Sequence, residues 1–176
     1  MKISILLPYK ENFSHVYAGA VSLFVKDTSV KSSFFKDIKI YGNTKYKKRL
    51  LTNYINLELN KSFFESGSKV YVDKFLEYEQ QNGSDLIEIH NRPNYVKFLI
   101  KKVNSKIILY FHNDPLSMNG SKSIKDRMFL LNNTDHLIFN SKWSRNRFFV
   151  GLNENLRDIK KISVVYQSAE KTIVNF

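Results

Sequence analysis

The chain has 176 residues and a mass of 20.7 kDa, the size of one ordinary domain, and its 43% hydrophobic and 25% charged residues are typical of a folded globular protein. The lack of cysteine excludes a disulfide scaffold, a cysteine nucleophile and a thiolate-bound metal, and fits a reducing compartment. Lys and Arg outnumber Asp and Glu by 28 to 16, and this net charge of +12 attracts the phosphates of nucleic acid, anionic lipid or phosphorylated sugars. No apolar run approaches the ~20 residues of a membrane span and no signal peptide is recognisable, so we expect neither.

The amino-terminal part of the sequence alternates strand and helix signals. The apolar run of residues 2–9, which a proline closes, predicts a buried strand, and apolar residues at helical spacing predict a helix over about residues 14–30. Residues 37–41 predict a second strand that ends at a Gly-Asn turn pair. Residues 43–67 fit either a strand or a helix, and we favour a third strand around residues 55–59.

The rest of the sequence alternates more clearly. Helices are expected over residues 68–82 and 94–103, and Ser123 and Ser141 are placed as N-caps of two more. Short apolar runs predict strands at residues 85–90, 106–111, 136–140 and 162–166. Because strands that alternate with helices form parallel sheets, we expect one α/β domain over residues 1–176, a doubly wound, mostly parallel, Rossmann-like sheet with helices on both faces.

Open α/β sheets bind ligands at the carboxyl ends of their strands, so the loops that follow the strands form the candidate site. His90 and His112 stand directly at two strand ends, where both imidazoles would project into one crevice, although a lone histidine is more often structural. Asp114 follows in the second of these loops and is either a general base or a turn residue. Gly19 either lets a backbone N–H approach a phosphate at a helix start or permits tight packing of helix on sheet.

Several motifs with a known chemistry are missing from the sequence. It contains no G-x-G-x-x-G fingerprint, no G-x-x-x-x-G-K-[ST] phosphate loop and no G-x-S-x-G elbow, which argues against dinucleotide binding and a serine nucleophile. Metal-ligand spacing is also absent, so we expect no metal and no cofactor. The two remaining histidines are expected to be solvated (His15) and structural (His136).

Three stretches carry a resemblance to a known family. They are DLIEIHNRP at residues 85–93, ILYFHNDP at residues 108–115 and HLIFNSKWSRNRF at residues 136–148, with weaker support from residues 2–19. Together they resemble retaining glycosyltransferases of the GT-B fold, and more narrowly the large "group 1" family, family 4, which builds lipopolysaccharide, capsule and related glycans. The resemblance covers most of the chain.

The resemblance implies the N-terminal, acceptor-binding half of an enzyme that moves a sugar from a nucleotide-sugar donor to a glycan or lipid-linked acceptor. It implies that His112 lies near the transferred sugar, that Gly19 approaches the donor diphosphate, and that His90, Arg92 and Asn113 line the acceptor side of the crevice. The second domain of such enzymes, which binds most of the nucleotide sugar, lies outside these 176 residues, so we expect the chain alone to be inactive.

Clusters of basic residues leave two other functions open. They allow a nucleic-acid-binding module, although no RNA-recognition, KH or helix-turn-helix signature is present and no specific nucleic acid is expected. They also allow a catalytically silent half that docks on a partner or on an anionic membrane surface. We expect a cytoplasmic protein, peripheral on the cytoplasmic face of the inner membrane if it meets lipid. The clusters are Lys45, Lys47, Lys48 and Arg49; Lys97, Lys101, Lys102 and Lys106; and Lys142, Arg145 and Arg147.

Overall fold

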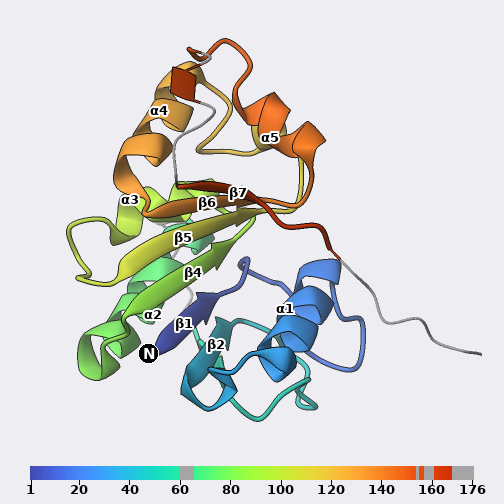
Figure 1. Cartoon of the computed structure of the whole chain (residues 1–176). Coiled ribbons are helices and arrows are strands. Elements are labelled where there is room, and N and C mark those ends of the chain that lie inside the picture. Colours follow the sequence, from blue (N-terminus) through green and yellow to red (C-terminus); the bar gives the residue numbers. More distant parts are fainter. Residues whose placement is uncertain (60–65, 154, 157–160, 168–176) are drawn as a thin grey trace, which may run out of the picture.

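The computed structural model describes residues 1–59, 66–153, 155–156 and 161–167 of the chain. Seven parallel strands form one sheet in the order β3-β2-β1-β4-β5-β6-β7 (Figure 1). The strands are β1 (Ile3–Leu6), β2 (Ile38–Gly42), β3 (Tyr54–Asn56), β4 (Leu86–His90), β5 (Lys106–Phe111), β6 (His136–Phe139) and β7 (Ile162–Val164). The doubly wound, Rossmann-like α/β fold expected from the alternation of strands and helices is therefore confirmed.

Helices and 3-10 turns connect the strands. The helices are α1 (Ala20–Lys31), α2 (Gly67–Asn82), α3 (Val96–Leu99), α4 (Ile124–Asn133) and α5 (Lys142–Phe148), and the 3-10 turns are η1 (Phe35–Asp37), η2 (Pro93–Tyr95) and η3 (Pro115–Ser117). Both predicted serine caps are present: the Ser123 side chain accepts a hydrogen bond from the backbone of Asp126 in a full capping box, and Ser141 accepts one from Ser144. Among the described residues, no helix is long and apolar enough to cross a membrane.

The sheet divides the apolar core into two unequal layers (Figure 1). On one face, α2, α3, α4 and α5 pack over the strands through buried side chains such as Tyr71, Phe75 and Phe148. On the other face, α1 packs through Val21 and Val25 onto β1 and β2. The side chains of β4 and β5 that point to this second face, beyond the edge of α1, include the polar groups of the candidate site.

Two helices differ from their expected extent. The first begins at Ala20 rather than near residue 14, and two apolar residues within the expected range, Val16 and Leu23, are 44% and 46% exposed. The third forms only Val96–Leu99 after the η2 turn, because Lys101 has a φ of 66°, a left-handed conformation that no α-helix continues through.

The strand order reverses between β1 and β4, since β2 lies on one side of β1 and β4 on the other. The connections after these two strands therefore leave the sheet in opposite directions, and sheets with such a reversal bind ligands in a crevice at this carboxyl edge. The chain segments that meet there are the long loop after β1, the loop after β4 and the loop after β5.

Candidate functional site

Two histidine rings meet at this carboxyl edge. His90 is the last residue of β4 and His112 follows the last residue of β5, and the Nδ1 atom of His90 lies 2.8 Å from the Nε2 atom of His112. The two rings therefore meet, as their places at adjacent strand ends predict, whereas their projection into a shared crevice stays a prediction. His90 is fully buried, whereas His112 is half-buried at the crevice wall.

A carboxylate and an amide extend this pair into a chain of four polar groups. On the inner side, Glu88 Oε1 lies 2.8 Å from His90 Nε2. The two atoms do not meet the geometry of a hydrogen bond, so His90 Nε2 has no hydrogen-bond partner. On the open side, the Gln167 side-chain amide contacts His112 Nδ1. Residues i and i+2 of a strand share a face, which explains why Glu88 and His90 both reach this point from β4.

One assignment of protons fits the contact between the two rings and the contact with Gln167, although it leaves His90 Nε2 without a hydrogen-bond partner. His90 Nε2 carries the proton toward the Glu88 carboxylate, so its Nδ1 accepts from the Nε2–H of His112. His112 Nδ1 is then an acceptor and receives the Gln167 amide N–H. In this assignment the half-buried Glu88 carboxylate favours a proton on the near side of the His90 ring, and the Nδ1 lone pair of His112 faces away from His90.

Aromatic rings enclose the pair and depress the pKa of His112 by burying it. The Tyr110 ring stacks on His112 with 4.4 Å between centroids, and Phe24 of α1 meets both histidines edge-on. Burial, aided by repulsion from His90, lowers the pKa of His112 to about 3. Burial and the charge of Glu88 raise the pKa of Tyr110 to about 12, so its phenol stays protonated and donates to the Val165 carbonyl at 2.7 Å.

Asn91 holds the loop after β4 against the loop after β5. Its side-chain oxygen accepts hydrogen bonds from the backbone N–H groups of His112 and Asn113 at 3.2 and 3.3 Å. Its φ of 55° is tolerated by asparagine better than by most residues. On the other side, the Asn140 amide donates to the His112 carbonyl at 2.7 Å, so the backbone that carries His112 is fixed from both neighbouring strands.

The Asp114 side chain stabilises the loop in which it lies. Its carboxylate accepts from Arg147 of α5, with 3.0 Å to Nη2, and from the backbone N–H of Leu116 at the start of η3. The hydrogen bond from Arg147 is the largest cause of a pKa below the usual range of an aspartate. A carboxylate held in this way is a weak proton acceptor, which favours the turn reading of Asp114 over the general-base reading.

Gly19 immediately precedes α1, and a carboxylate already occupies that helix start. The Glu11 carboxylate receives the Ser22 backbone N–H at 3.2 Å, and a Cβ on Gly19 would lie 1.9 Å from Glu11 Oε1. Glycine is required here for the close approach of Glu11. A diphosphate at the same N–H groups would have to displace this side chain, because two anions would repel each other there.

Arg92 and Asn113 lie on the loops after β4 and β5, but they point to different surroundings. Arg92 lines a polar hollow on the α2 side of the sheet edge, and its Nη1 atom donates to the Asn91 carbonyl at 2.8 Å. Asn113 is exposed, and its backbone N–H is held by Asn91. The buried His90 reaches the crevice only through His112. The remaining histidines lie elsewhere, with His15 exposed and His136 Nε2 2.7 Å from Ser163 Oγ.

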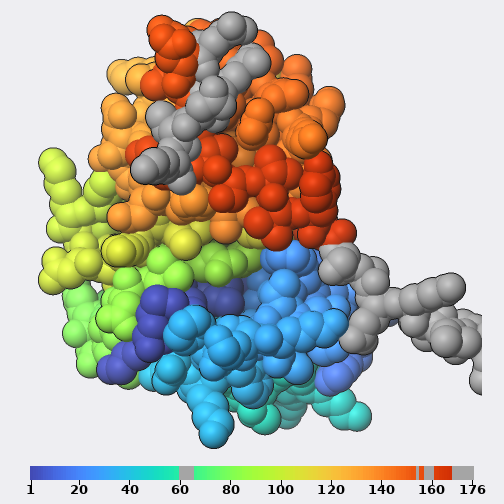
Figure 2. Space-filling view, viewed as in Figure 1, coloured from blue at the N-terminus to red at the C-terminus, as the bar shows by residue number. Residues whose placement is uncertain are grey.

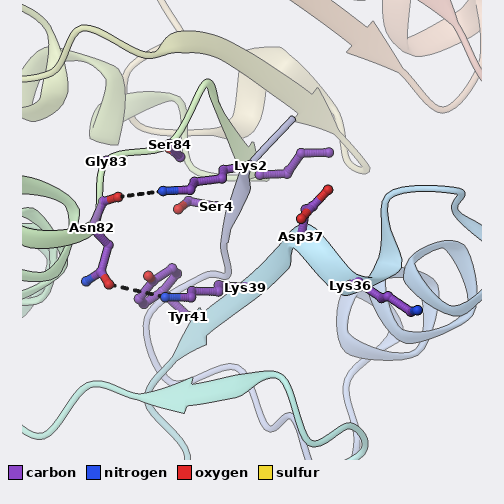
Figure 3. A pocket seen from close by; sticks show the side chains of 10 residues that line it. Lys2, Ser4, Lys36, Asp37, Lys39, Tyr41, Asn82, Gly83 and Ser84 are labelled. Atoms are coloured by element: carbon purple, nitrogen blue, oxygen red, sulfur yellow. Dashed lines mark hydrogen bonds between the residues drawn. The ribbon is translucent and has the colours of Figure 1, made fainter.

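A second hollow, of about 220 Å³, lies at the opposite, amino edge of the sheet (Figure 3). Lys2 and Lys39 reach across it to Asn82 at the end of α2, where they donate to its backbone and side-chain oxygens at 3.5 and 3.2 Å. Ligands of such sheets bind at the carboxyl edge, so this hollow is a poor candidate for the reaction site. Among the described residues, no cluster of three or more His, Cys, Asp or Glu is placed to hold a metal ion.

Sequence reasoning missed three contributors to the crevice. Glu88 was detectable, because it alternates with His90 on one predicted strand and so had to share its face. Gln167 and Phe24 had no such signal, since they reach His112 from the segment after β7 and from α1. In Figure 2 these two segments, coloured red and blue, lie side by side.

The fold is similar to that of several solved enzymes, although no family model matches the sequence and no curated protein matches it significantly. The apo form of the lipopolysaccharide outer core galactosyltransferase WaaB superposes with a TM-score of 0.65 at 14% identity, over 99% of this chain and 48% of that one. The HepE protein of Anabaena, in complex with UDP and glucose, gives 0.58 at 15% identity, over 94% and 44%. A UDP-N-acetylglucosamine 2-epimerase from Rickettsia bellii gives 0.55 at 13% identity, over 93% and 44%.

The chain spans about half the length of these enzymes. At identities of 13–15% the likeness establishes the fold and leaves activity to be argued from the site. By its sheet order, its helices and these matches, the chain has the same Rossmann-like α/β architecture as about half of each of these proteins.

Proposed function

We propose that the chain is the acceptor-binding half of a glycosyltransferase that moves a sugar from a nucleotide-sugar donor to a glycan or lipid-linked acceptor. The observation that carries the proposal is His112, enclosed by aromatic rings, in contact with His90 and lowered in pKa, at the carboxyl edge of a sheet similar to those of WaaB and HepE. WaaB is a galactosyltransferase of lipopolysaccharide and HepE was solved with UDP-glucose, which favours a UDP-sugar donor and a cell-surface glycan as product.

The geometry favours a positioning role for His112 over charge stabilisation. A ring with a pKa of about 3 is uncharged near neutral pH, so it offers a lone pair and no positive charge to a departing diphosphate. Its Nδ1 atom accepts a hydrogen bond from the Gln167 amide, and a sugar hydroxyl can replace that amide as the donor. We therefore propose that His112 orients the transferred sugar at the crevice wall.

The carboxylates near the crevice are consistent with a retaining reaction, in which no strong protein base acts on the attacking side. Glu11, Glu88 and Asp114 are held by Ser22, His90 and Arg147 respectively. We propose that Asp114 positions the loop of His112 and that Glu88 and His90 support its tautomer. The groups that bind most of the donor would come from a second domain, with Gly19 contributing to the diphosphate site only if Glu11 moves.

The test is sugar transfer by the protein as purified from its source cells, whatever its native length by intact mass. Radiolabelled UDP-sugars are incubated with the protein and with the glycan and lipid-linked acceptors of those cells. We expect label in the glycan fraction, an unchanged anomeric configuration in the product, and at least ~100-fold less label with His112→Ala, as for the loss of a group aimed at the reacting sugar.

The matched control is His136→Ala, which removes a half-buried histidine on the same sheet away from the crevice. It should keep nearly full activity, and both variants should keep a melting temperature within a few degrees of the parent. Absence of any transfer, or equal losses of activity and melting temperature in His112→Ala, contradicts the proposed function.

A further inference from the structure

A polar hollow of about 380 Å³ lies where the loops after β4 and β5 approach the start of α2. This volume falls in the lower range of small-molecule sites and accommodates one substituted sugar ring. Its polar lining includes Ser68, Arg92, Asn94, Ser117, Asn119 and Lys122. They come from three separate segments and carry mostly hydrogen-bonding groups.

The charge in this hollow is entirely positive. Arg92 and Lys122 are its ionised residues, and no acidic side chain lines it. In the described part of the chain, neither has a carboxylate partner within salt-bridge distance. The nearest carboxylates along the sequence are engaged elsewhere: Glu88 with His90, and Asp126 with Ser123. Two uncompensated cations facing one polar hollow attract an anion.

Contacts within the protein hold the walls of the hollow in place. Gly120 packs so closely on Asn94 that a Cβ would lie 2.6 Å from the Asn94 backbone nitrogen, and its φ is 94°. The buried Ser121 hydroxyl donates to the Pro115 carbonyl at 2.5 Å and closes the loop after β5 on itself. The Arg92 guanidinium is fixed by its bond to the Asn91 carbonyl. A site arranged in advance loses little entropy on binding.

We propose that this hollow binds a phosphate group carried by the acceptor, so that the acceptor is a phosphorylated sugar or a phosphate-linked lipid. A phosphate accepts hydrogen bonds from several directions, which suits a guanidinium, an ammonium, hydroxyls and amides converging from three segments. The statement that the phosphate belongs to an acceptor rests on the proposed function. The phosphate chemistry rests on the hollow alone and is tested separately from transfer.

The experiment titrates the ¹⁵N-labelled chain with glucose 6-phosphate and with glucose, at a constant salt concentration of about 150 mM that screens nonspecific attraction. We expect saturable NMR shifts of the Ser68, Asn94 and Asn119 amides with glucose 6-phosphate, and binding of glucose at least ~10-fold weaker. Arg92→Gln and Lys122→Gln should each weaken glucose 6-phosphate about tenfold, as expected for a lost charge-assisted hydrogen bond.

Lys36→Gln is the matched control, since it removes one positive charge from the other hollow, at the amino edge of the sheet (Figure 3). It should leave the affinity unchanged. Equal binding of glucose and glucose 6-phosphate overturns the inference. An equal loss of affinity in Lys36→Gln and Lys122→Gln also overturns it, because net charge alone would then attract the ligand.

Competition between glucose 6-phosphate and lipid vesicles identifies the source of the phosphate. Displacement of glucose 6-phosphate by phosphatidylcholine vesicles that contain phosphatidic acid, but not by pure phosphatidylcholine, supports a lipid phosphate; resistance to both supports a sugar phosphate. Saturable binding that Arg92→Gln weakens upholds the site even if no sugar transfer is found. Conversely, transfer at equal rates to phosphorylated and unphosphorylated acceptors overturns the inference and leaves the proposed function standing.

Discussion

The imidazole of His112 lies between the Tyr110 ring and the edge of Phe24, with His90 as its hydrogen-bond partner. Protonation there would place a cation in an apolar enclosure beside a second imidazole. Its Nε2–H is engaged by His90, so only Nδ1 is left to interact with a ligand. The folded state therefore favours a neutral ring with a defined tautomer, and this preference has a measurable effect on stability.

The free energy of unfolding should depend on pH through His112. Its pKa is depressed to about 3 in the folded state, against about 6.5 when unfolded, so the unfolded chain binds more protons between these values. The contribution is fully present above pH 6.5 and is lost as pH falls. Between pH 7 and pH 5 the parent should lose up to about 2 kcal/mol more free energy of unfolding than His112→Gln loses. Urea unfolding at each pH measures this difference.

Comparing the two proteins at each pH removes the effect of the carboxylates that both retain. The groups that face His112 are His90, Tyr110 and Gln167, with Glu88 behind His90, and all remain in the variant. Parallel pH profiles for the parent and His112→Gln would mean that the ring titrates normally, and would contradict the enclosed, neutral state.

The sequence predicted the meeting of His90 and His112 because strand ends of a parallel sheet share one edge, a rule that needs no tertiary detail. It did not predict that His90 would be buried under Phe24, nor that Glu11 would cover the start of α1. Both depend on how a loop and a helix fold back over the sheet, which short-range patterns do not encode. Arg92 and Asn113 were placed at the right edge, while their contacts with a ligand stay a prediction.

The loop after β5 is the most constrained connecting element of the site. It is held at one end by Asn91 and Asn140, at its middle by the ion pair of Asp114 with Arg147, and near its far end by Gly120 against Asn94. These contacts link it to the segment after β4 and to the segment after β6. A disturbance at its tightest point should therefore reach both His112 and the polar hollow.

Gly120→Ala is expected to destabilise the protein by about 2–4 kcal/mol, because the new methyl group meets backbone atoms of Asn94 and the residue keeps a left-handed φ. Gly83→Ala is the matched control, since Gly83 also has a positive φ, 56°, but has open space around its Cβ position. That change should cost about 1 kcal/mol from backbone strain alone. Thermal unfolding measures both, and equal costs would mean that the contact with Asn94 is not tight.

Strands were predicted to within a few residues because each is a short apolar run bounded by polar residues, as in β5 at Lys106–Phe111. Helices were less certain. The expected helix over residues 94–103 shrank to Val96–Leu99, since Pro93 starts a 3-10 turn and Lys101 turns left-handed. The third strand, ambiguous in the sequence, forms at Tyr54–Asn56 because it pairs with β2, a contact that local sequence does not reveal.

The net charge of +12 acts on the molecule as a whole rather than at one site. Arg147 is drawn from the third basic cluster into its ion pair with Asp114, and Arg49 lies over the Tyr54 ring. In the first two clusters, Lys47, Lys48, Lys101 and Lys102 remain exposed. Exposed lysines of this kind give a diffuse attraction to polyanions without a shaped reading surface.

We therefore expect weak binding of random single-stranded nucleic acid that disappears as salt rises to about 150 mM. The measurement is a gel shift at several salt concentrations. Glucose 6-phosphate binding through the polar hollow, by contrast, should survive that salt because it uses hydrogen bonds as well as charge. Nucleic-acid binding that stays tight at the higher salt would favour the nucleic-acid module over the glycosyltransferase half.

The central place of β1 in the sheet has a consequence for synthesis of the chain. β1 pairs with β2 on one side and with β4 on the other, and the flanking residues Lys2 and Asp85, joined by a hydrogen bond, are 83 positions apart. The ribosome adds roughly 5–20 residues per second, so on the order of 4–16 s pass between the synthesis of β1 and that of β4. During this time the edge of β1 that pairs with β4 has no partner strand. Nascent chains are thus exposed to aggregation during that interval, and chaperones that shield the edge of the first strand should raise the yield of folded protein.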